Sequence, residues 1–252
     1  MMLEKKNSHL RDKRIQFFED GHYYLIDGKK GYTSVTTYIH SLFPQFNADN
    51  VINKMMKSKK WPQSKYYGMT KEEIKQSWDK NRDEAAIAGT NFHRALELYY
   101  NNAPQEIPEI LDTKEYNHFK EFLEVYGHKK AYRTEWSIFH EEFNLSGQID
   151  MCYENDDGTY DIYDWKRSKE IKKYSAYESG LKEPVDQLPN TNFWHYSLQL
   201  NIYRYILEQK YGKKIKEMAI VVFHPNNDSF IRYKIPNLQD IVEELYKKRT
   251  NL

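Results

Sequence analysis

The spacing of apolar and polar residues separates segments with a strand-like period from segments with a helical period. Short stretches rich in β-branched and aromatic residues predict strands at 131–139, 146–153, 159–166, 217–224 and 229–234, after a hairpin at 15–27. Apolar residues three and four positions apart predict helices at 34–43, 49–58, 71–101, 113–127, 194–211 and 238–249. This order predicts a single α/β unit with helical additions near the amino terminus.

The turn between the segments 146–153 and 159–166 has an Asp-Asp-Gly sequence that ends at Gly158. The two segments therefore read as adjacent antiparallel strands. A three-residue loop with a left-handed Gly158 pairs Asn155 with Thr159. Asp150 then lies opposite Asp164. A two-residue loop would shift the register by one and place the two carboxylates on opposite faces. We expect the three-residue loop.

Lys166 follows Asp164 by two residues, so both side chains point to the same face of the strand. Opposed residues have β-carbons about 4.5 to 5.5 Å apart, which lets two carboxylates share a cation. Oxygen ligands favour Mg²⁺ or Mn²⁺, one or two ions, and such an ion activates water for phosphodiester hydrolysis. The alternative is a solvated hairpin face that carries an ion pair.

Two helical segments add polar side chains at helical spacing. Gly89, His93 and Glu97 recur every four residues in the segment 71–101. Because a glycine costs a helix about 1 kcal/mol relative to alanine, Gly89 suggests close approach of another backbone or a ligand. Gln199 and Tyr203 lie one turn apart in the segment 194–211. His93 could reach a metal held by the hairpin, and Gln199 with Tyr203 could contact a phosphate backbone or a base. The alternatives are a satisfied structural histidine and a helix packing edge.

Four short motifs occur in a characteristic order along the chain. They are Gly-x-x-x-His (89–93), Gly-x-Ile-Asp (147–150), Asp-x-Lys (164–166) and Gln-x-x-x-Tyr (199–203). In this order, the motifs resemble the RecB-type branch of the PD-(D/E)xK nucleases. With the Tyr-Thr-Ser-Val-Thr segment at 32–36, the layout resembles the single-domain exonucleases of the mitochondrial genome maintenance type and their phage and viral relatives. The resemblance covers roughly residues 15–235.

The resemblance implies a role for each matching residue. His93, Asp150, Asp164 and the carbonyl of Trp165 would bind the metal, and Lys166 would be catalytic together with His93 and the two acids. Gln199 and Tyr203 would support the site or touch DNA. Further DNA contacts are expected from residues beside the motifs, namely Arg94, Arg167 and Ser168. Glu97 would hold His93 from behind. Glu135 is expected to be only a charge on a strand edge.

The family also implies a restriction-endonuclease-like core, in which helices flank a central mixed sheet. We expect a tail at 1–14 and one nuclease domain at 15–252, divided into a hairpin and helices (15–70) and a catalytic core (71–252). The implied function is a Mg²⁺-dependent DNA exonuclease that prefers single strands or free ends and acts in DNA replication, recombination or repair. The alternatives are an endonuclease that cuts flaps or branches, and a catalytically silent nucleic-acid-binding module.

Composition narrows these expectations. The single cysteine, Cys152, excludes a disulfide within the chain and a four-cysteine iron–sulfur cluster. A net charge of +1 argues against strong non-specific binding of duplex DNA, although lysines cluster at 54–60 and 166–173. Either basic run can also be a solvated helix face. With 22 tyrosines, some aromatic side chains are candidates for stacking on unpaired bases, while most belong to the core.

No apolar stretch approaches the length of a membrane span, and the amino terminus lacks a secretory signal. The segment 1–14 contains acidic residues and so does not read as a transit peptide. We therefore expect a soluble intracellular protein with DNA as its partner, while protein partners are not indicated. The irregular segment 174–193 is long for a compact domain, which predicts a substrate guide or clamp.

Overall fold

A six-stranded mixed sheet forms the centre of the molecule in the computed structural model, which describes residues 2–21, 23–102 and 108–251. Its strands are β3 (Thr33–Ser34), β4 (Lys130–His140), β5 (Leu145–Glu154), β6 (Tyr160–Lys166), β7 (Ile215–Val222) and β8 (Ile231–Lys234). The order is β3-β5-β6-β7-β8, and β4 pairs with β5. The β3–β5 and β6–β7 pairs are parallel, whereas the others are antiparallel. The α/β class with a mixed sheet is confirmed.

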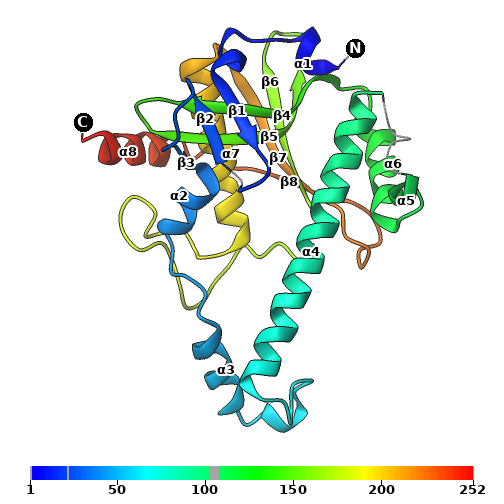
Figure 1. Cartoon of the computed structure of the whole chain (residues 1–252), viewed down its shortest axis with the longest axis vertical. Helices are drawn as coiled ribbons and strands as arrows, with labels where there is room; N and C mark the ends of the chain where they lie inside the picture. Colours follow the sequence, from blue (N-terminus) through cyan, green and yellow to red (C-terminus); the bar gives the residue numbers. More distant parts are fainter. Residues whose placement is uncertain (1, 22, 103–107, 252) are drawn as a thin grey trace.

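Helices cover both faces of this sheet (Figure 1). On one face, α4 (Lys71–Tyr100) and α6 (Lys114–Tyr126) pack aromatic side chains against β5, β6 and β7. On the other face lie α2 (Val35–Ser41), α7 (Asn192–Lys210) and α8 (Gln239–Thr250). The short helix α5 (Pro108–Leu111) precedes α6. The two apolar cores therefore clamp the central strands from both sides.

The amino-terminal part adds short elements around this core. The helices are α1 (Leu3–Lys6), η1 (Leu10–Arg14), α3 (Ala48–Met56) and η2 (Trp61–Gln63), and β1 (Ile15–Phe18) pairs with β2 (Tyr23–Ile26). The β1–β2 hairpin packs on Phe139 of β4. Residues before the hairpin also contact the core, since the Asn7 side-chain amide donates to the carbonyl of Tyr132 at 2.7 Å.

The helix α4 begins where the sequence supplies a capping box. The Thr70 hydroxyl accepts the Glu73 N–H, and the Glu73 carboxylate accepts the Thr70 N–H. From this cap the helix runs for 30 residues toward the sheet. Its first half projects from the core, with α3 and η2 beside its start, while its second half packs on the sheet (Figure 1).

Most predicted elements lie within two residues of their observed bounds. The elements that the pattern did not predict are short. One of them is β3, which has two residues and pairs with the start of β5. Such pieces are too short to carry a period, so the sequence pattern cannot reveal them. None of the helices among the described residues combines the length and the apolar character needed to cross a membrane.

Candidate metal and catalytic centre

The hairpin between β5 and β6 has the predicted three-residue loop. The Asn155 N–H donates to the Thr159 carbonyl at 2.8 Å, and Gly158 has a φ of 78°. The strands pair from Glu154 opposite Tyr160 to Met151 opposite Tyr163. One further step of this register places Asp150 opposite Asp164, as the loop length predicted.

The backbone pairing of β5 with β6 ends at Met151 and Tyr163, one pair before the two acids. Beyond this point the N–H of Trp165 bonds a side chain in place of a backbone carbonyl. The Trp165 N–H donates to Asp150 Oδ2 at 2.8 Å. Strand β5 also changes its inward face here, since Ile149 packs in the α7-side core and Met151 in the α4-side core. Alternate residues of a regular strand share one face, so β5 is irregular at Asp150. The centre therefore lies where the sheet opens.

His93 reaches this opening from α4. Its Nε2 lies 2.8 Å from the carbonyl oxygen of Trp165, and because a carbonyl only accepts, Nε2 donates this hydrogen bond. Its Nδ1 lies 3.6 Å from Asp150 Oδ2. The structure thus brings together the histidine, the first acid and the Trp165 carbonyl. Helix α4 holds the ring in place, because Phe92 and Leu96 on either side of it are buried in the core.

Glu135 of β4 completes this group, although we expected it to be only a charge on a strand edge. It lies on an edge strand as expected, yet its Oε1 is 3.8 Å from His93 Nδ1. The flanking pairs Thr134–Met151 and Trp136–Ile149 place it opposite Asp150. Its φ of 45° is left-handed, a conformation that costs a side-chain-bearing residue about 1 kcal/mol or more. A strained carboxylate aimed at a histidine is a feature to expect at a functional site.

Lys166 faces Asp164 on the α7 side of the opening. Its Nζ lies 2.7 Å from Asp164 Oδ2 and 4.7 Å from the centre of the Tyr196 ring. The same-face placement of Asp164 and Lys166 is therefore observed. Tyr196 was anticipated only as one of several aromatic side chains, but it lies near the start of α7 and contacts the ammonium group through a cation–π interaction.

Burial dominates the electrostatics of the acids in this group. Burial raises the pKa of Asp164 to about 6, even though Lys166 and His93 oppose the shift. Burial also raises the pKa of Asp150. For His93, burial lowers the pKa, but the charges of Asp150 and Glu135 outweigh it and raise the pKa to about 9. The pKa of Lys166 is raised by Asp164 and Asp150, which outweigh its burial.

Gln199 and Tyr203 support the hairpin from α7. Both side chains are buried, and the Gln199 amide donates to the Tyr203 hydroxyl at 3.1 Å. The Tyr203 ring lies against Gly147, where a β-carbon would come within 2.5 Å of Tyr203 Cε1. The Gly-x-Ile-Asp and Gln-x-x-x-Tyr motifs thus meet in space. Of the two expected roles, contact with DNA or support of the site, this burial favours support.

The remaining candidates lie around the group with partners of their own. Arg94 contacts Glu97 at 2.6 Å, and Arg167 contacts Glu115 at 2.7 Å. Glu97 was expected to hold His93, but the carboxylates beside the ring are those of Asp150 and Glu135. Ser168 donates its hydroxyl to the carbonyl of Glu170 at 3.0 Å.

Gly89 is not explained by a neighbouring backbone. A β-carbon built there would meet no described atom within 4 Å. Close approach of another backbone, one of the two explanations expected for this glycine, is therefore not observed.

The donor set fits a hard divalent cation. His93, Glu135 and Asp150 each offer one ligand atom, and these atoms lie within 4.8 Å of one another. One imidazole nitrogen with carboxylate oxygens can hold a divalent metal ion. Asp164, which is opposite Asp150, adds a buried carboxylate whose Oδ2 lies 2.7 Å from Lys166 Nζ. Ligation by the Trp165 carbonyl would replace its hydrogen bond from His93.

Comparison with known proteins agrees with this geometry. The family model described as the PD-(D/E)XK nuclease superfamily matches residues 63–249. This range includes His93, Glu135, Asp150, Asp164 and Lys166. No curated protein sequence matches the chain. Two similar solved structures are SSO0001, with 15% identity over 62% of this chain and 69% of that chain (TM-score 0.28), and a candidate exonuclease from Eubacterium rectale, with 16% identity over 66% and 67% (TM-score 0.38).

Proposed function

The chain belongs to the PD-(D/E)XK nuclease superfamily, and from this premise we propose that it is a divalent-metal-dependent DNA exonuclease that prefers single strands or free ends. One observation carries the proposal. Two opposed carboxylates and a lysine lie on one opened hairpin, and a histidine and a third carboxylate from other elements lie beside them. Such an activity would serve DNA replication, recombination or repair.

The acidic residues and His93 would hold Mg²⁺ or Mn²⁺. Asp150, Asp164 and His93 are the ligands that the family resemblance implies, and Glu135 is the further ligand that the geometry supports. When bound, the ion would lower the pKa of a coordinated water and neutralise charge that develops on the phosphate. Asp150 is already oriented by the Trp165 N–H, which leaves its other oxygen for ligation.

Lys166 would position the attacking water or the scissile phosphate. Its raised pKa keeps the amine protonated at neutral pH, so it acts as a hydrogen-bond donor and a positive charge rather than as a base. Asp164 and the Tyr196 ring hold the ammonium in place. Attack in line with the leaving oxygen would give 5′-phosphate and 3′-hydroxyl ends, as the family resemblance implies.

A digestion series tests this proposal. Linear single strands labelled at either end, and circular single strands, are incubated with the protein and Mg²⁺, with Mn²⁺, or with a chelator. We expect metal-dependent loss of the linear strands and intact circles, and no cleavage by Asp164→Asn. Cleaved circles would indicate the endonuclease instead. No cleavage of any substrate with either metal would indicate a silent binding module.

A further inference from the structure

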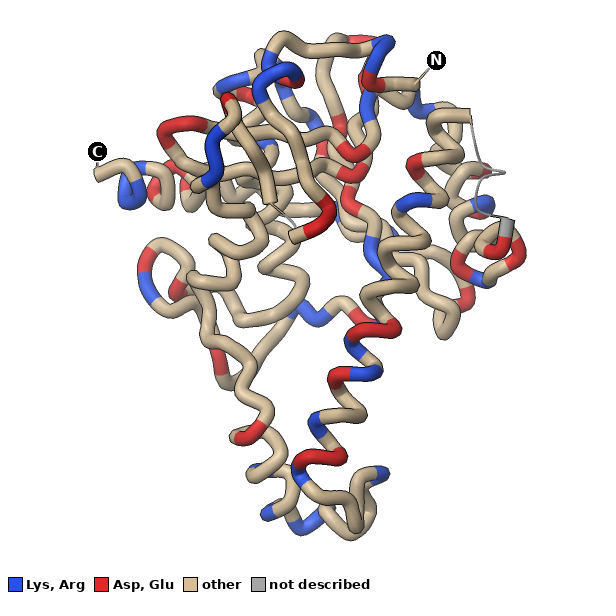
Figure 2. Tube along the Cα trace, in the orientation of Figure 1, with Lys and Arg blue, Asp and Glu red and all other residues tan. Residues whose placement is uncertain are grey.

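The segment 50–71, here called the lysine tip, is the most basic part of the chain. It contains six lysines and no acidic residue, namely Lys54, Lys57, Lys59, Lys60, Lys65 and Lys71. The whole chain has a net charge of +1, so subtracting +6 leaves −5 for all other residues. The tip lies around α3, η2 and the start of α4, at the end of the molecule far from the sheet, where Figure 2 shows lysines gathered.

The lysines of the tip are free to meet a ligand. All six are exposed, and in the part of the chain that the structure describes none of them forms an ion pair. Lys75, which follows the tip, is already paired with Asp49 at 2.6 Å. Unpaired lysines repel one another, so a surface that holds six of them together favours a polyanion. This excess of lysine belongs to the segment itself, since Asp49 precedes it in α3 and Glu72 and Glu73 follow it in α4.

Aromatic side chains are interleaved with these lysines. Trp61 lines a cavity of about 390 Å³ together with Lys60, Gln63, Ser64, Ser58 and Met55. The Trp61 ring is also held edge-on by Tyr67, at 5.9 Å between centroids. An indole face, an amide and a lysine within one cavity suit a nucleobase stacked on the ring with its phosphate near the ammonium.

The tip is also firmly connected to the nuclease centre. The Trp78 indole N–H donates to the Tyr66 hydroxyl at 2.9 Å, which fastens the tip to α4. The same helix carries His93, 22 residues after Lys71, so about 33 Å of helix separates the two at 1.5 Å per residue. A stacked single strand covers this distance with about ten nucleotides at about 3.4 Å each, and a stretched strand with fewer.

We propose that the lysine tip is a second binding site for the single-stranded nucleic acid on which the nuclease centre acts. The inference rests on the proposed function. A strand long enough to reach the tip is held at both ends of α4, whereas a shorter strand is held at the centre alone. Lys59 and Lys60 bind phosphates, and Trp61 stacks on a base. The tip therefore sets a length dependence of binding without taking part in the chemistry.

Binding in the presence of a chelator tests the tip without cleavage. Fluorescence anisotropy is measured with oligothymidines of about six and about twenty nucleotides, which are shorter and longer than the estimated span. For the wild type we expect much tighter binding of the longer strand. In Lys59→Ala/Lys60→Ala the Kd for the longer strand should rise on the order of tenfold at low salt, and the slope of log K against log salt should fall by about 1.4. Binding of the shorter strand should not change.

A matched variant controls for the lost charge. Lys5→Ala/Lys6→Ala removes two exposed lysines from α1, which lies at the opposite end of the molecule (Figure 1), and should leave both Kd values unchanged. Trp61→Ala should weaken binding of the longer strand, and Trp61→Phe should restore it. Equal affinities of the tip variant and the wild type for the longer strand would overturn the proposal. So would an equal loss in the α1 variant, or binding of the tip to anionic vesicles with no preference for the longer strand.

Cleavage assays separate this proposal from the proposed function. With Mg²⁺, the tip variant should cut the short strand at the wild-type rate and the longer strand, at limiting concentration, more slowly. Unequal rates on the short strand would place the tip within the catalytic machinery and overturn the proposal. If the wild type cuts neither strand yet still binds the longer one through the tip, the nuclease function fails while the tip stands.

Discussion

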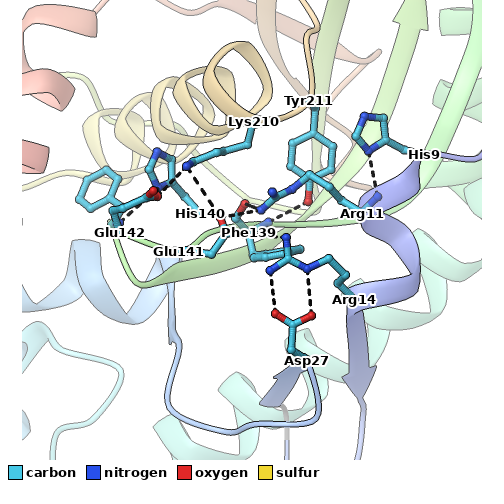
Figure 3. A network of polar contacts seen from close by, with 11 residues as sticks. His9, Arg11, Arg14, Asp27, Phe139, His140, Glu141, Glu142, Lys210 and Tyr211 are labelled. Carbon is cyan, nitrogen blue, oxygen red and sulfur yellow. Dashed lines mark hydrogen bonds and ion pairs between the residues drawn. The ribbon is translucent and has the colours of Figure 1, made fainter.

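Strand β4 and the residue after it each contribute a carboxylate to a different polar group, and the pKa values of the acids shift in opposite directions in the two groups. Glu135, in its middle, faces the nuclease centre, while Glu141, just after its end, lies in the network of Figure 3. Burial raises the pKa of Glu141, but the hydrogen bond and charges from Arg11, with the charge of Arg14, outweigh it and lower the pKa to about 2. In the centre, burial prevails and the pKa of Asp164 rises to about 6.

The difference lies in the balance of charge. Glu141 is 2.8 Å from Arg11 and 2.9 Å from Arg14, so two cations serve one carboxylate, and Lys210 bonds the neighbouring Glu142. In the centre, three carboxylates share His93 and Lys166. A cluster of buried carboxylates with too few cationic neighbours destabilises the folded protein. The same excess of negative charge favours the binding of a divalent cation. The first group is therefore suited to holding the fold together, and the second to binding a metal.

Asp164→Asn should have the largest effect on nuclease activity of the variants that test this comparison. Removing a proposed ligand should lower nuclease activity by at least about 10³-fold. The folded pKa of Asp164 is raised above its ordinary value, so its ionised form is destabilising above pH 6. Its replacement relieves this destabilisation at pH 7 but leaves Lys166 without its buried partner, so the two effects oppose each other and stability should change little. Denaturant unfolding with a chelator measures this change.

Asp161→Asn is the matched control on the same strand. Asp161 is buried and lies 2.7 Å from Lys129 Nζ, on the face away from Lys166. Its replacement breaks a buried ion pair, so stability should fall while activity stays near that of the wild type. If Asp164→Asn kept its nuclease activity, or if Asp161→Asn lost it, the proposed division between the two acids would be wrong.

The sequence predicted the local part of the centre and missed the part made by distant segments. The β5–β6 register followed from one turn, because a left-handed Gly158 fixes the loop length. Glu135 could not be foreseen, since its position depends on non-local pairing of β4 with β5 and on a left-handed backbone that no glycine marks. The helical pattern indicated that His93 could reach the hairpin, and the resemblance then favoured a metal ligand over a structural histidine.

The burial of α7 was a second feature that the sequence pattern did not predict. Gln199 and Tyr203 were expected to support the site or touch DNA, and both are buried, as are their polar neighbours Ser197 and Asn201. Hydrogen bonds within the fold satisfy them, for example from the Asn201 amide to the carbonyl of Pro236 at 3.0 Å. Polar residues on a helix predict exposure only where no other element covers them, and here α2, α8 and the sheet do so.

Glu135→Gln should sharpen the comparison by testing the acid that the structure added. Loss of one proposed ligand should raise the Mg²⁺ concentration needed for half-maximal activity by about 10- to 100-fold. Activity at saturating Mn²⁺ should recover better than that of Asp164→Asn. The control is Glu97→Gln, which changes the carboxylate paired with Arg94. A similar shift in both variants, or none in Glu135→Gln, would remove Glu135 from the metal site.

Glu141→Gln should have the smallest effect and act on stability alone. The folded pKa of Glu141 is about 2, below its ordinary value of 4.5, so its charge stabilises the fold above pH 4.5, and this contribution is lost as the pH falls toward 2. At pH 7 the variant should lose about 1 to 2 kcal/mol of unfolding free energy, allowing for solvent screening. The deficit should shrink to nothing near pH 2.

Glu124→Gln, at an exposed position of α6, should show no deficit at either pH. Because the Arg11 and Arg14 pairs lie outside the centre, nuclease activity at pH 7 should not change. A loss of activity in Glu141→Gln would mean that the network and the centre act together through β4, and the two groups could no longer be treated as separate.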